Sequence, residues 1–277
     1  MWLTWTAKQM AKKLFKRRKR AQFRPYVVRH DFRNQSFDFW IGDETGKKWY
    51  DNSGESYATD LELSEALLTP GDRVLEIGCH HGFYTMFLAK AIGRDGYVLG
   101  VEAHPGSAMI AQAQVALNGL GAGCKILPLA CSDAPGSLTF TGKVGEESCA
   151  MVANTSTPWP AGFTDGEKYI VKAVTGDALS DEYGPFNVLK IDVEGFEGKV
   201  LAGCQQILAR RPRIMLELHI SALAHIPDTV EHIFELLNIR HYTGRVLLRD
   251  WRTVLPFNPD DLPKEHIINL YLTPTTD

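Results

Sequence analysis

The sequence lacks several features that would place it in a specialised class of protein. No apolar run approaches the roughly 18–20 residues that a membrane-spanning helix needs. The five cysteines are widely spaced and include no CxxC pair, which excludes a zinc ribbon and a disulfide framework and predicts free, buried thiols in a reducing compartment. Internal repeats and low-complexity tracts are absent, and a charged fraction of 23% excludes wholesale disorder.

Acidic residues are absent from residues 1–24, which hold nine Lys and Arg side chains. The rest of the chain holds the other 21 of the 30 basic residues and all 33 acidic residues, so it is strongly acidic although the net charge of the whole chain is only −3. The chain is therefore expected to be a basic arm on an acidic body. An acidic body argues against a surface that coats nucleic acid.

The basic arm has its apolar residues at helical spacing, at Leu3, Ala7, Met10, Ala11 and Leu14. One interpretation is an amphipathic helix that contacts an anionic membrane or partner, with Trp2 and Trp5 at the interface. The other is a solvated, partly disordered tail. The apolar residues precede the basic cluster and no hydrophobic region follows it, which is not the pattern of a secretory signal. We therefore expect a cytoplasmic protein, peripheral to a membrane only in the first interpretation.

Short apolar runs alternate with helical segments through the predicted main domain, residues 61–277. We expect strands at 73–77, 97–101, 125–129, 187–191, 213–218 and 267–272, and helices at 62–68, 84–92, 107–117, 196–208 and 229–237. Alternating strands and helices predict a Rossmann-like, doubly wound α/β fold with a mostly parallel sheet. Two segments break the pattern: the aromatic-rich residues 25–60 predict short strands or a lid, and the insertion at about 130–185 predicts a cap that faces the substrate.

The most informative motif is a buried strand that carries Glu76, followed by a turn with Gly78 and Gly82 and the start of a helix. A dinucleotide site would have the spacing GxGxxG and backbone donors facing a pyrophosphate. This chain has ExGxxxG instead, and a carboxylate suits a cationic or polyhydroxyl ligand. The motif therefore disfavours NAD and favours S-adenosylmethionine.

Further polar residues follow the other predicted strands. Glu102 ends the second strand about 20 residues after the glycine turn, where doubly wound folds place the acid that binds ribose hydroxyls. Ser132 and Asp133 follow the third strand and either reach an adenine edge or belong to an ordinary loop. Two later strands end in acidic and histidine residues: Asp192, Glu194, Glu217 and His219. The carboxyl ends of parallel strands share one edge of the sheet, so we expect these groups to line one cleft.

These motifs resemble those of the FkbM-type methyltransferases, which are class I enzymes dependent on S-adenosylmethionine. The resemblance runs from about residue 60 to residue 219 and is most specific in LKIDVEGFEGKVLAG, residues 189–203. It implies a seven-stranded sheet, contacts of Glu76, Gly78 and Gly82 with the methionine end of the cofactor, and a contact of Glu102 with the ribose. Within the same motifs we assign further cofactor contacts to Cys79, His80, Thr85, Ala103 and Asp192. Enzymes of this type are associated with O-methylation of sugars, polyketides and related metabolites, so the expected acceptor is a hydroxyl of a sugar, glycolipid or other small metabolite.

Methylation of a hydroxyl requires a group that takes up the hydroxyl proton. His219 and Asp192 are the candidates, and a core or capping role for His219 is the alternative. A divalent metal ion held by Asp192, Glu217 and His219 is a less favoured hypothesis.

Two other functions stay open at the level of the sequence. One is an N-methyltransferase or nucleic-acid methyltransferase that uses the basic arm to reach phosphates. The acidic body and the lack of an Asn/Asp-Pro-Pro-Tyr motif argue against it. The other is a non-catalytic Rossmann module tethered by the arm.

Overall fold

The computed structural model of the protein describes residues 23–52, 57–143, 146–152, 168–223, 225–226 and 228–276. Residues 1–22 of the predicted basic arm lie outside the described residues, so the amphipathic helix stays a prediction. Among the residues that are described, no helix combines the length and the apolar character needed to cross a membrane.

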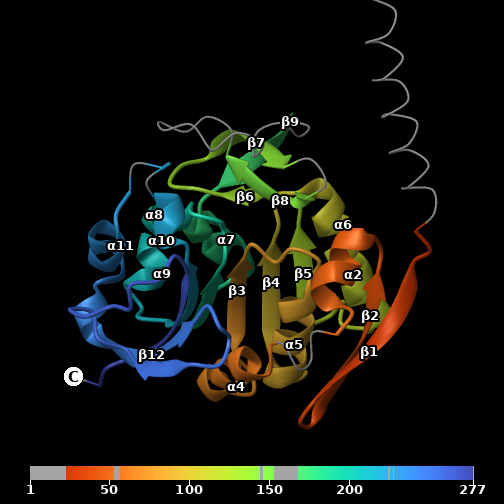
Figure 1. The fold of residues 1–277 in the computed structure, drawn as a ribbon, viewed down its shortest axis with the longest axis horizontal. Helices are drawn as coiled ribbons and strands as arrows, with labels where there is room; N and C mark the ends of the chain where they lie inside the picture. The colour runs from red at the N-terminus through yellow and green to blue at the C-terminus, as the bar shows by residue number, and fades with distance from the viewer. Residues whose placement is uncertain are drawn as a thin grey trace, which may run out of the picture.

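The centre of the fold is an eight-stranded sheet with the strand order β13-β12-β14-β11-β10-β3-β4-β5 (Figure 1). Five neighbouring strands are parallel: β3 (Arg73–Ile77), β4 (Tyr97–Val101), β5 (Cys124–Leu127), β10 (Val188–Ile191) and β11 (Arg213–Leu218). The antiparallel strands are β12 (Tyr242–Leu248), β13 (Val254–Pro256) and β14 (Ile268–Pro274). The predicted doubly wound α/β fold is confirmed. The short β13 adds an eighth strand to the seven expected, and neither β12 nor β13 was predicted.

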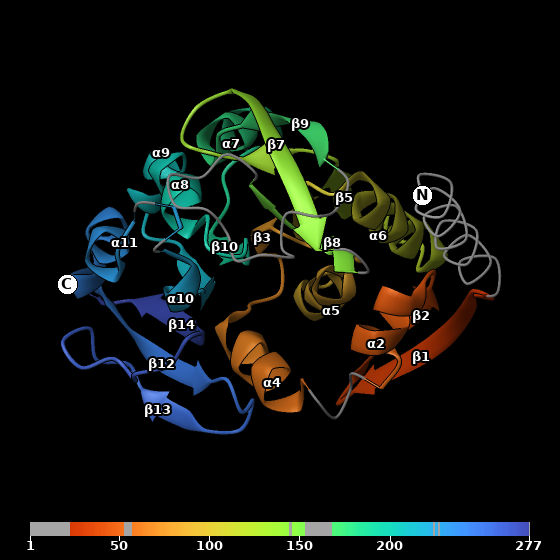
Figure 2. The ribbon, with the colours of Figure 1, turned by 45° about the horizontal axis from the view of Figure 1, so that its top comes forward.

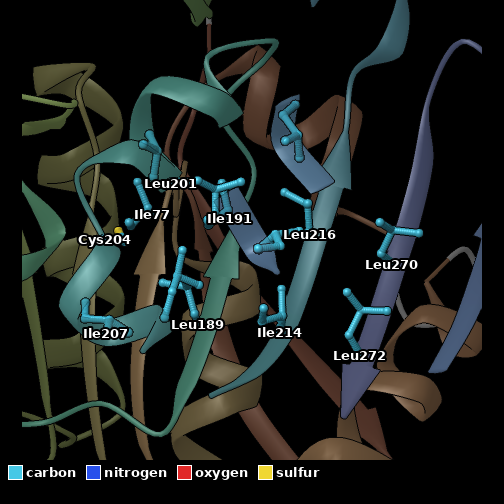
Figure 3. Packing of buried hydrophobic residues seen from close by; sticks show 14 of the residues in the cluster. Ile77, Leu189, Ile191, Leu201, Cys204, Ile207, Ile214, Leu216, Leu270 and Leu272 are labelled. Atoms are coloured by element: carbon cyan, nitrogen blue, oxygen red, sulfur yellow. The ribbon is translucent and has the colours of Figure 1, made fainter. Parts of the chain in front are cut away.

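Successive side chains of each strand point to opposite faces of the sheet, and because the strands are nearly continuous apolar runs both faces are buried. Val74, Val98 and Val188 point to one face, which is covered by α4 (Ala58–Leu67), α5 (Phe83–Ile92) and α6 (Pro105–Leu117). Their chain neighbours point to the other face, which is covered by α7 (Gly176–Tyr183), α8 (Glu197–Ala202), α9 (Gln205–Leu208) and α11 (Val230–Leu237). Figure 3 shows this second layer, in which Leu201, Cys204 and Ile207 pack on the sheet.

The helix expected at 196–208 is interrupted, and α8 and α9 are separate short helices. The interruption falls at Gly203, where a Cβ atom would lie 2.1 Å from the backbone oxygen of Ser132. A continuous helix with a larger residue would therefore collide with the loop after β6 (Ala130–Cys131). Beyond α9, the chain adds α10 (Ile220–Leu223) after β11 and the short helix η1 (Ile239–His241) before β12.

The segment before the main domain forms a hairpin of β1 (Tyr26–Phe32) and β2 (Gln35–Ile41), followed by α2 (Glu44–Tyr50). Three side chains of β2 are buried against α5 and α6: Phe37, Phe39 and Ile41. Figure 2 shows the hairpin beside these two helices. Gln114 on α6 bonds the backbone N–H and the backbone oxygen of Trp40. These hydrogen bonds hold β2 against α6, and α2, which follows β2 in the chain, lies at the edge of the cavity described below.

The insertion after β5 contains a second sheet with the order β6-β9-β7-β8. Its strands are β6 (Ala130–Cys131), β7 (Gly136–Lys143), β8 (Glu146–Val152) and β9 (Lys168–Val174). Figure 1 shows this sheet above the central one. Phe140 of β7 lines the cavity at the carboxyl ends of the central strands, so the insertion forms part of the cavity wall.

Candidate active site

A cavity lies where the strand order reverses between β3 and β10. Its lining comes from the carboxyl ends of β3, β4, β10 and β11 and from α2, α4 and β7. In open α/β sheets this reversal separates the two adjacent loops and leaves a crevice for ligands. The fold therefore has a cavity at the edge of the sheet where the sequence predicts a cleft.

Gly78 allows the loops after β3 and β10 to approach each other closely. Its φ is +86°, and a Cβ atom built on it would lie 1.7 Å from the backbone oxygen of Asp192. The N–H groups of Gly78 and Cys79 donate to the backbone oxygen of Val101, which ties the same turn to β4. No residue with a side chain satisfies both the positive φ and the contact with Asp192.

Glu76 is fully buried beneath this turn. One oxygen, Oε2, accepts a hydrogen bond of 2.5 Å from Thr85 Oγ1, and the other, Oε1, lies 3.8 Å from Lys190 Nζ without a hydrogen-bond partner. Burial raises the pKa of Glu76, while Lys190 and Thr85 oppose that rise. Glu76 is thus a carboxylate with unused hydrogen-bonding capacity at the base of the cavity.

Lys190 is the cation at the centre of a buried polar group. Glu76 and Lys190 are register partners on β3 and β10, and both point to the face covered by α4 and α5. Burial lowers the pKa of Lys190, but the carboxylates around it, Glu76 and Asp192 foremost, outweigh burial and leave the pKa raised. The same environment includes Asp60 on α4, which accepts a short hydrogen bond from the hydroxyl of Tyr271 and whose pKa burial raises to about 7.

Glu102 organises the loop that follows β4. Its two carboxylate oxygens accept hydrogen bonds of 2.7 Å from the backbone N–H groups of His80 and His104. Burial raises the pKa of Glu102 to about 7, and the two backbone donors oppose the rise. Each oxygen keeps a lone pair, and the residue lines the cavity, so Glu102 can still accept hydrogen bonds from ligand hydroxyls.

The two histidines of the glycine turn stack on each other, with ring centroids 4.1 Å apart. His80 lines the cavity, and its Nδ1 lies 2.6 Å from the hydroxyl of Tyr50 on α2. Burial lowers the pKa of both imidazoles, to about 4 for His81. They are therefore neutral at physiological pH and act as packed, uncharged rings beside the turn.

A second polar group forms where β10 and β11 end. His219 Nδ1 lies 2.8 Å from Oε1 of the fully buried Glu197, and the same oxygen accepts a hydrogen bond from the N–H of Gly195. On the other side of the ring, His219 Nε2 lies 3.3 Å from Glu194 and 3.8 Å from Glu217. Burial lowers the pKa of His219, but Glu197, Glu194 and Glu217 together raise it to about 10.

The structure brings most of the predicted site residues together around the cavity. Its lining includes Glu76, Gly78, Cys79, His80, Glu102, Ala103, Asp192, Glu194, Glu217 and His219. Four predicted cofactor contacts are not among the lining residues. Thr85 donates a hydrogen bond to Glu76, and Gly82 packs against Ala111 of α6. Ser132 bonds Asp133, which pairs with Lys199 at 2.6 Å.

Sequence reasoning missed Lys190, Asp60, Glu197, Arg249 and the aromatic wall of Trp49, Tyr57 and Trp251. Lys190 carried a readable signal, because a lysine inside an otherwise apolar, buried strand needs a buried carboxylate partner. Glu197 looked like an ordinary acid in the first turn of a helix. The aromatic residues come from three segments that no motif connects.

The cavity lining fits S-adenosylmethionine, which carries an ammonium, a sulfonium and ribose hydroxyls. Its acidic residues are Asp60, Glu76, Glu102, Asp192, Glu194 and Glu217, six in all, against three basic side chains, Lys190, Arg249 and the protonated His219. Such a lining attracts cations and accepts hydrogen bonds from hydroxyls, and it repels phosphates. Glu76, Gly78 and Glu102, the residues that the sequence predicts to contact the cofactor, line this cavity.

Comparison with known protein families gives two matches. A family described as methyltransferase FkbM domain matches residues 76–246. A family described as protein-L-isoaspartate(D-aspartate) O-methyltransferase matches residues 7–134. Among curated proteins, none matches the chain.

Several solved structures are similar in fold. A putative rRNA methylase from Clostridium thermocellum is 11% identical, with 80% of this chain and 97% of that chain covered and a TM-score of 0.48. A methyltransferase FkbM from Methylobacillus flagellatus KT is 11% identical, with 83% and 56% covered and a TM-score of 0.44. An O-methyltransferase from Bacillus cereus in complex with SAH is 16% identical, with 79% and 81% covered and a TM-score of 0.41.

Proposed function

Because the chain belongs to the methyltransferase FkbM domain family, it is an S-adenosylmethionine-dependent methyltransferase, and we propose that it methylates a hydroxyl group of a sugar, glycolipid or other small metabolite. The observation that carries the proposal is the polar group of Asp192, Glu194 and His219 at the cavity wall. A hydroxyl acceptor must lose its proton as the methyl group arrives, and this group offers the proton a destination.

In the proposed reaction the acceptor oxygen forms a bond to the methyl carbon while the bond from that carbon to sulfur breaks. S-adenosylmethionine supplies the methyl group, activated by the positive charge on sulfur, and S-adenosylhomocysteine leaves. Glu76 and Glu102 would hold the two ends of the cofactor and so fix the position of its methyl group for transfer. The raised pKa keeps His219 protonated at neutral pH, so Asp192 is the favoured acceptor of the hydroxyl proton and His219 orients the acceptor.

The lining of the cavity supports a small, hydroxyl-bearing acceptor. Tyr57 and Trp251 meet edge to face with ring centroids 5.5 Å apart, and both line the cavity. Aromatic walls with a few polar groups are typical of sites for small organic ligands. The excess of carboxylates repels a phosphate backbone, which disfavours the nucleic-acid alternative.

A transfer screen with methyl-labelled S-adenosylmethionine tests the proposal. Purified full-length protein is incubated with panels of glycans, glycolipids and hydroxylated metabolites, and with amines and RNA as competing classes. We expect label only in the hydroxylated panels, in an ether that survives mild base. Label in an amine or in RNA would overturn the proposed acceptor class.

The variant Glu102→Gln is expected to weaken the binding of S-adenosylmethionine by about 10- to 30-fold, since a neutral amide loses a charge-assisted hydrogen bond worth roughly 1.5–3 kcal/mol. Its amide group also cannot accept from both His80 and His104. Titration calorimetry gives the dissociation constant, and Glu235→Gln on the exposed face of α11 is the matched control. Unchanged affinity in Glu102→Gln would remove Glu102 from the cofactor site.

The variant Asp192→Asn is expected to lower turnover about 100-fold, because the amide cannot take up the hydroxyl proton. The dissociation constant of S-adenosylmethionine should change much less than turnover. Single-turnover kinetics with the acceptor found in the screen measure the first quantity, and calorimetry measures the second. Equal losses in turnover and in cofactor affinity would show that Asp192 only binds the cofactor.

A further inference from the structure

Asp192, Glu194 and His219 each direct one potential ligand atom towards a common point at the cavity wall. These three atoms all lie within 4.8 Å of one another. We propose that this trio binds one divalent transition-metal ion, Mn²⁺ or Zn²⁺, with an open coordination position towards the cavity. This trio differs from the metal-binding set predicted from the sequence, which had Glu217 in the place of Glu194.

The separations between the ligand atoms fit a shared ion. His219 Nε2 and Glu194 Oε2 are 3.3 Å apart. Two atoms bound at about 2.1 Å to one ion lie roughly 3.0–3.4 Å apart at bond angles of 90–110°, and about 4.2 Å apart when opposite each other. No separation in the trio exceeds 4.8 Å, so a small side-chain rotation would bring all three ligand atoms to bonding distance of one ion.

The support of His219 is the second and independent observation. The imidazole is buried, and its Nδ1 is fixed by Glu197, a residue outside the trio with no exposed surface. Glu197 is itself held by the N–H of Gly195, so the ring is locked with Nε2 facing Glu194 and Asp192. A buried carboxylate on the far nitrogen is the arrangement that orients metal-binding histidines.

The charge around the trio also favours a cation. Two cations lie beside the group: Arg249 is 3.9 Å from Glu217, and Lys190 interacts with Asp192. Four carboxylates, on Asp192, Glu194, Glu197 and Glu217, lie around the His219 imidazole, whose Nε2 proton a bound ion would displace. Like charges this close repel, and an ion between them offsets the repulsion. One imidazole with two carboxylates suits Mn²⁺ or Zn²⁺ better than Mg²⁺, which prefers oxygen ligands alone.

An ion at this position would meet the acceptor oxygen and lower the pKa of its hydroxyl. This role rests on the proposed function, whereas binding of the ion does not. The two are therefore separable by experiment.

The test is direct metal binding by the full-length protein after dialysis against chelator. Mn²⁺ is titrated in, and the free ion is followed by its electron paramagnetic resonance signal; Zn²⁺ and Mg²⁺ are then added as competitors. We expect one Mn²⁺ per chain, displaced by Zn²⁺ and poorly by Mg²⁺. Glu194→Gln should weaken binding at least tenfold, and Glu197→Gln, which replaces the charged support of the ring by a neutral amide, should weaken it by 10- to 100-fold. Glu235→Gln on exposed α11 is the control that should leave binding unchanged.

Circular dichroism shows whether each variant is folded. Glu194→Gln is the decisive variant, because the side chain is 46% exposed and glutamine has nearly the same size and shape. Absence of Mn²⁺ and Zn²⁺ binding, or equal binding by wild type and Glu194→Gln, overturns the metal site. Calorimetry with S-adenosylmethionine runs in parallel. If the wild-type protein binds S-adenosylmethionine but no metal ion, the metal proposal alone is refuted. If the wild-type protein does not bind S-adenosylmethionine, the result counts against the proposed function instead.

Discussion

Replacement of Lys190 by methionine is expected to lower the free energy of unfolding by about 3–5 kcal/mol, the usual cost of removing one partner from a buried ion pair. Lys190 is 8% exposed, and its Nζ lies 3.8 Å from the fully buried Glu76. Methionine fills a similar volume, so the effect comes from charge rather than from a cavity. Chemical denaturation at pH 8 measures it.

Two further variants isolate the electrostatic origin of that loss. Lys199→Met removes a lysine of an exposed pair with Asp133 and should cost less than about 1 kcal/mol. The double variant Lys190→Met/Glu76→Gln should recover part of the stability, since the neutral amide needs no counter-charge. If the double variant is no more stable than Lys190→Met, the ion pair is not the cause.

The loss in Lys190→Met should also depend on pH. Burial raises the pKa of Glu76, and it raises that of Asp60 to about 7; without the lysine both values rise further. A carboxyl with a raised pKa in the folded state binds more protons there than in the unfolded chain, so stability falls as pH rises above about 4. We therefore expect a larger deficit at pH 8.5 than at pH 5.5. A deficit independent of pH would point to altered packing.

The variant Gly78→Ala is expected to lower the free energy of unfolding by about 2–5 kcal/mol and to abolish cofactor binding. The positive φ costs roughly 1–2 kcal/mol for a residue with a side chain, and a close packing clash adds about 1–3 kcal/mol. The clash is with a backbone atom, the oxygen of Asp192, at 1.7 Å, so relief requires the loops after β3 and β10 to separate.

Gly71→Ala is the matched control for this variant. Gly71 has a φ of +88°, almost the same as Gly78, but a Cβ atom there would meet nothing within 4 Å. It should therefore cost only the strain of roughly 1–2 kcal/mol and leave the affinity for S-adenosylmethionine unchanged. If both variants lose the same stability and both bind cofactor, the contact between Gly78 and Asp192 does not shape the site.

The predicted strands of the parallel core agree with the structure to within two residues, because each is a short apolar run between turn residues. β12 was missed because its sequence, YTGRVLL, has a glycine and an arginine at its centre and resembles a loop. Pairing with β14 over seven residues makes it a strand. Such a strand depends on its neighbours rather than on its own residues.

The residues of the site also fall into those that the sequence could predict and those that it could not. Residues at strand ends, such as Glu76, Glu102 and Asp192, could be predicted because parallel strands bring their carboxyl ends to one edge. Asp60 and Trp251 could not, since they come from a helix before the first core strand and from a loop after β12. Their approach to the cavity depends on how α4 and the β12–β13 hairpin pack.

The sequence by itself determined the doubly wound fold, the acidic carboxyl edge and the preference for a cationic cofactor, because these follow from residue order along each strand. Only the tertiary structure decided which acidic side chain pairs with which basic side chain. Lys190 meets Glu76 because β3 and β10 are neighbours in register, and Glu197 meets His219 because α8 begins beside the end of β11. Residues far apart in the chain acquire these contacts through packing, which no local pattern encodes.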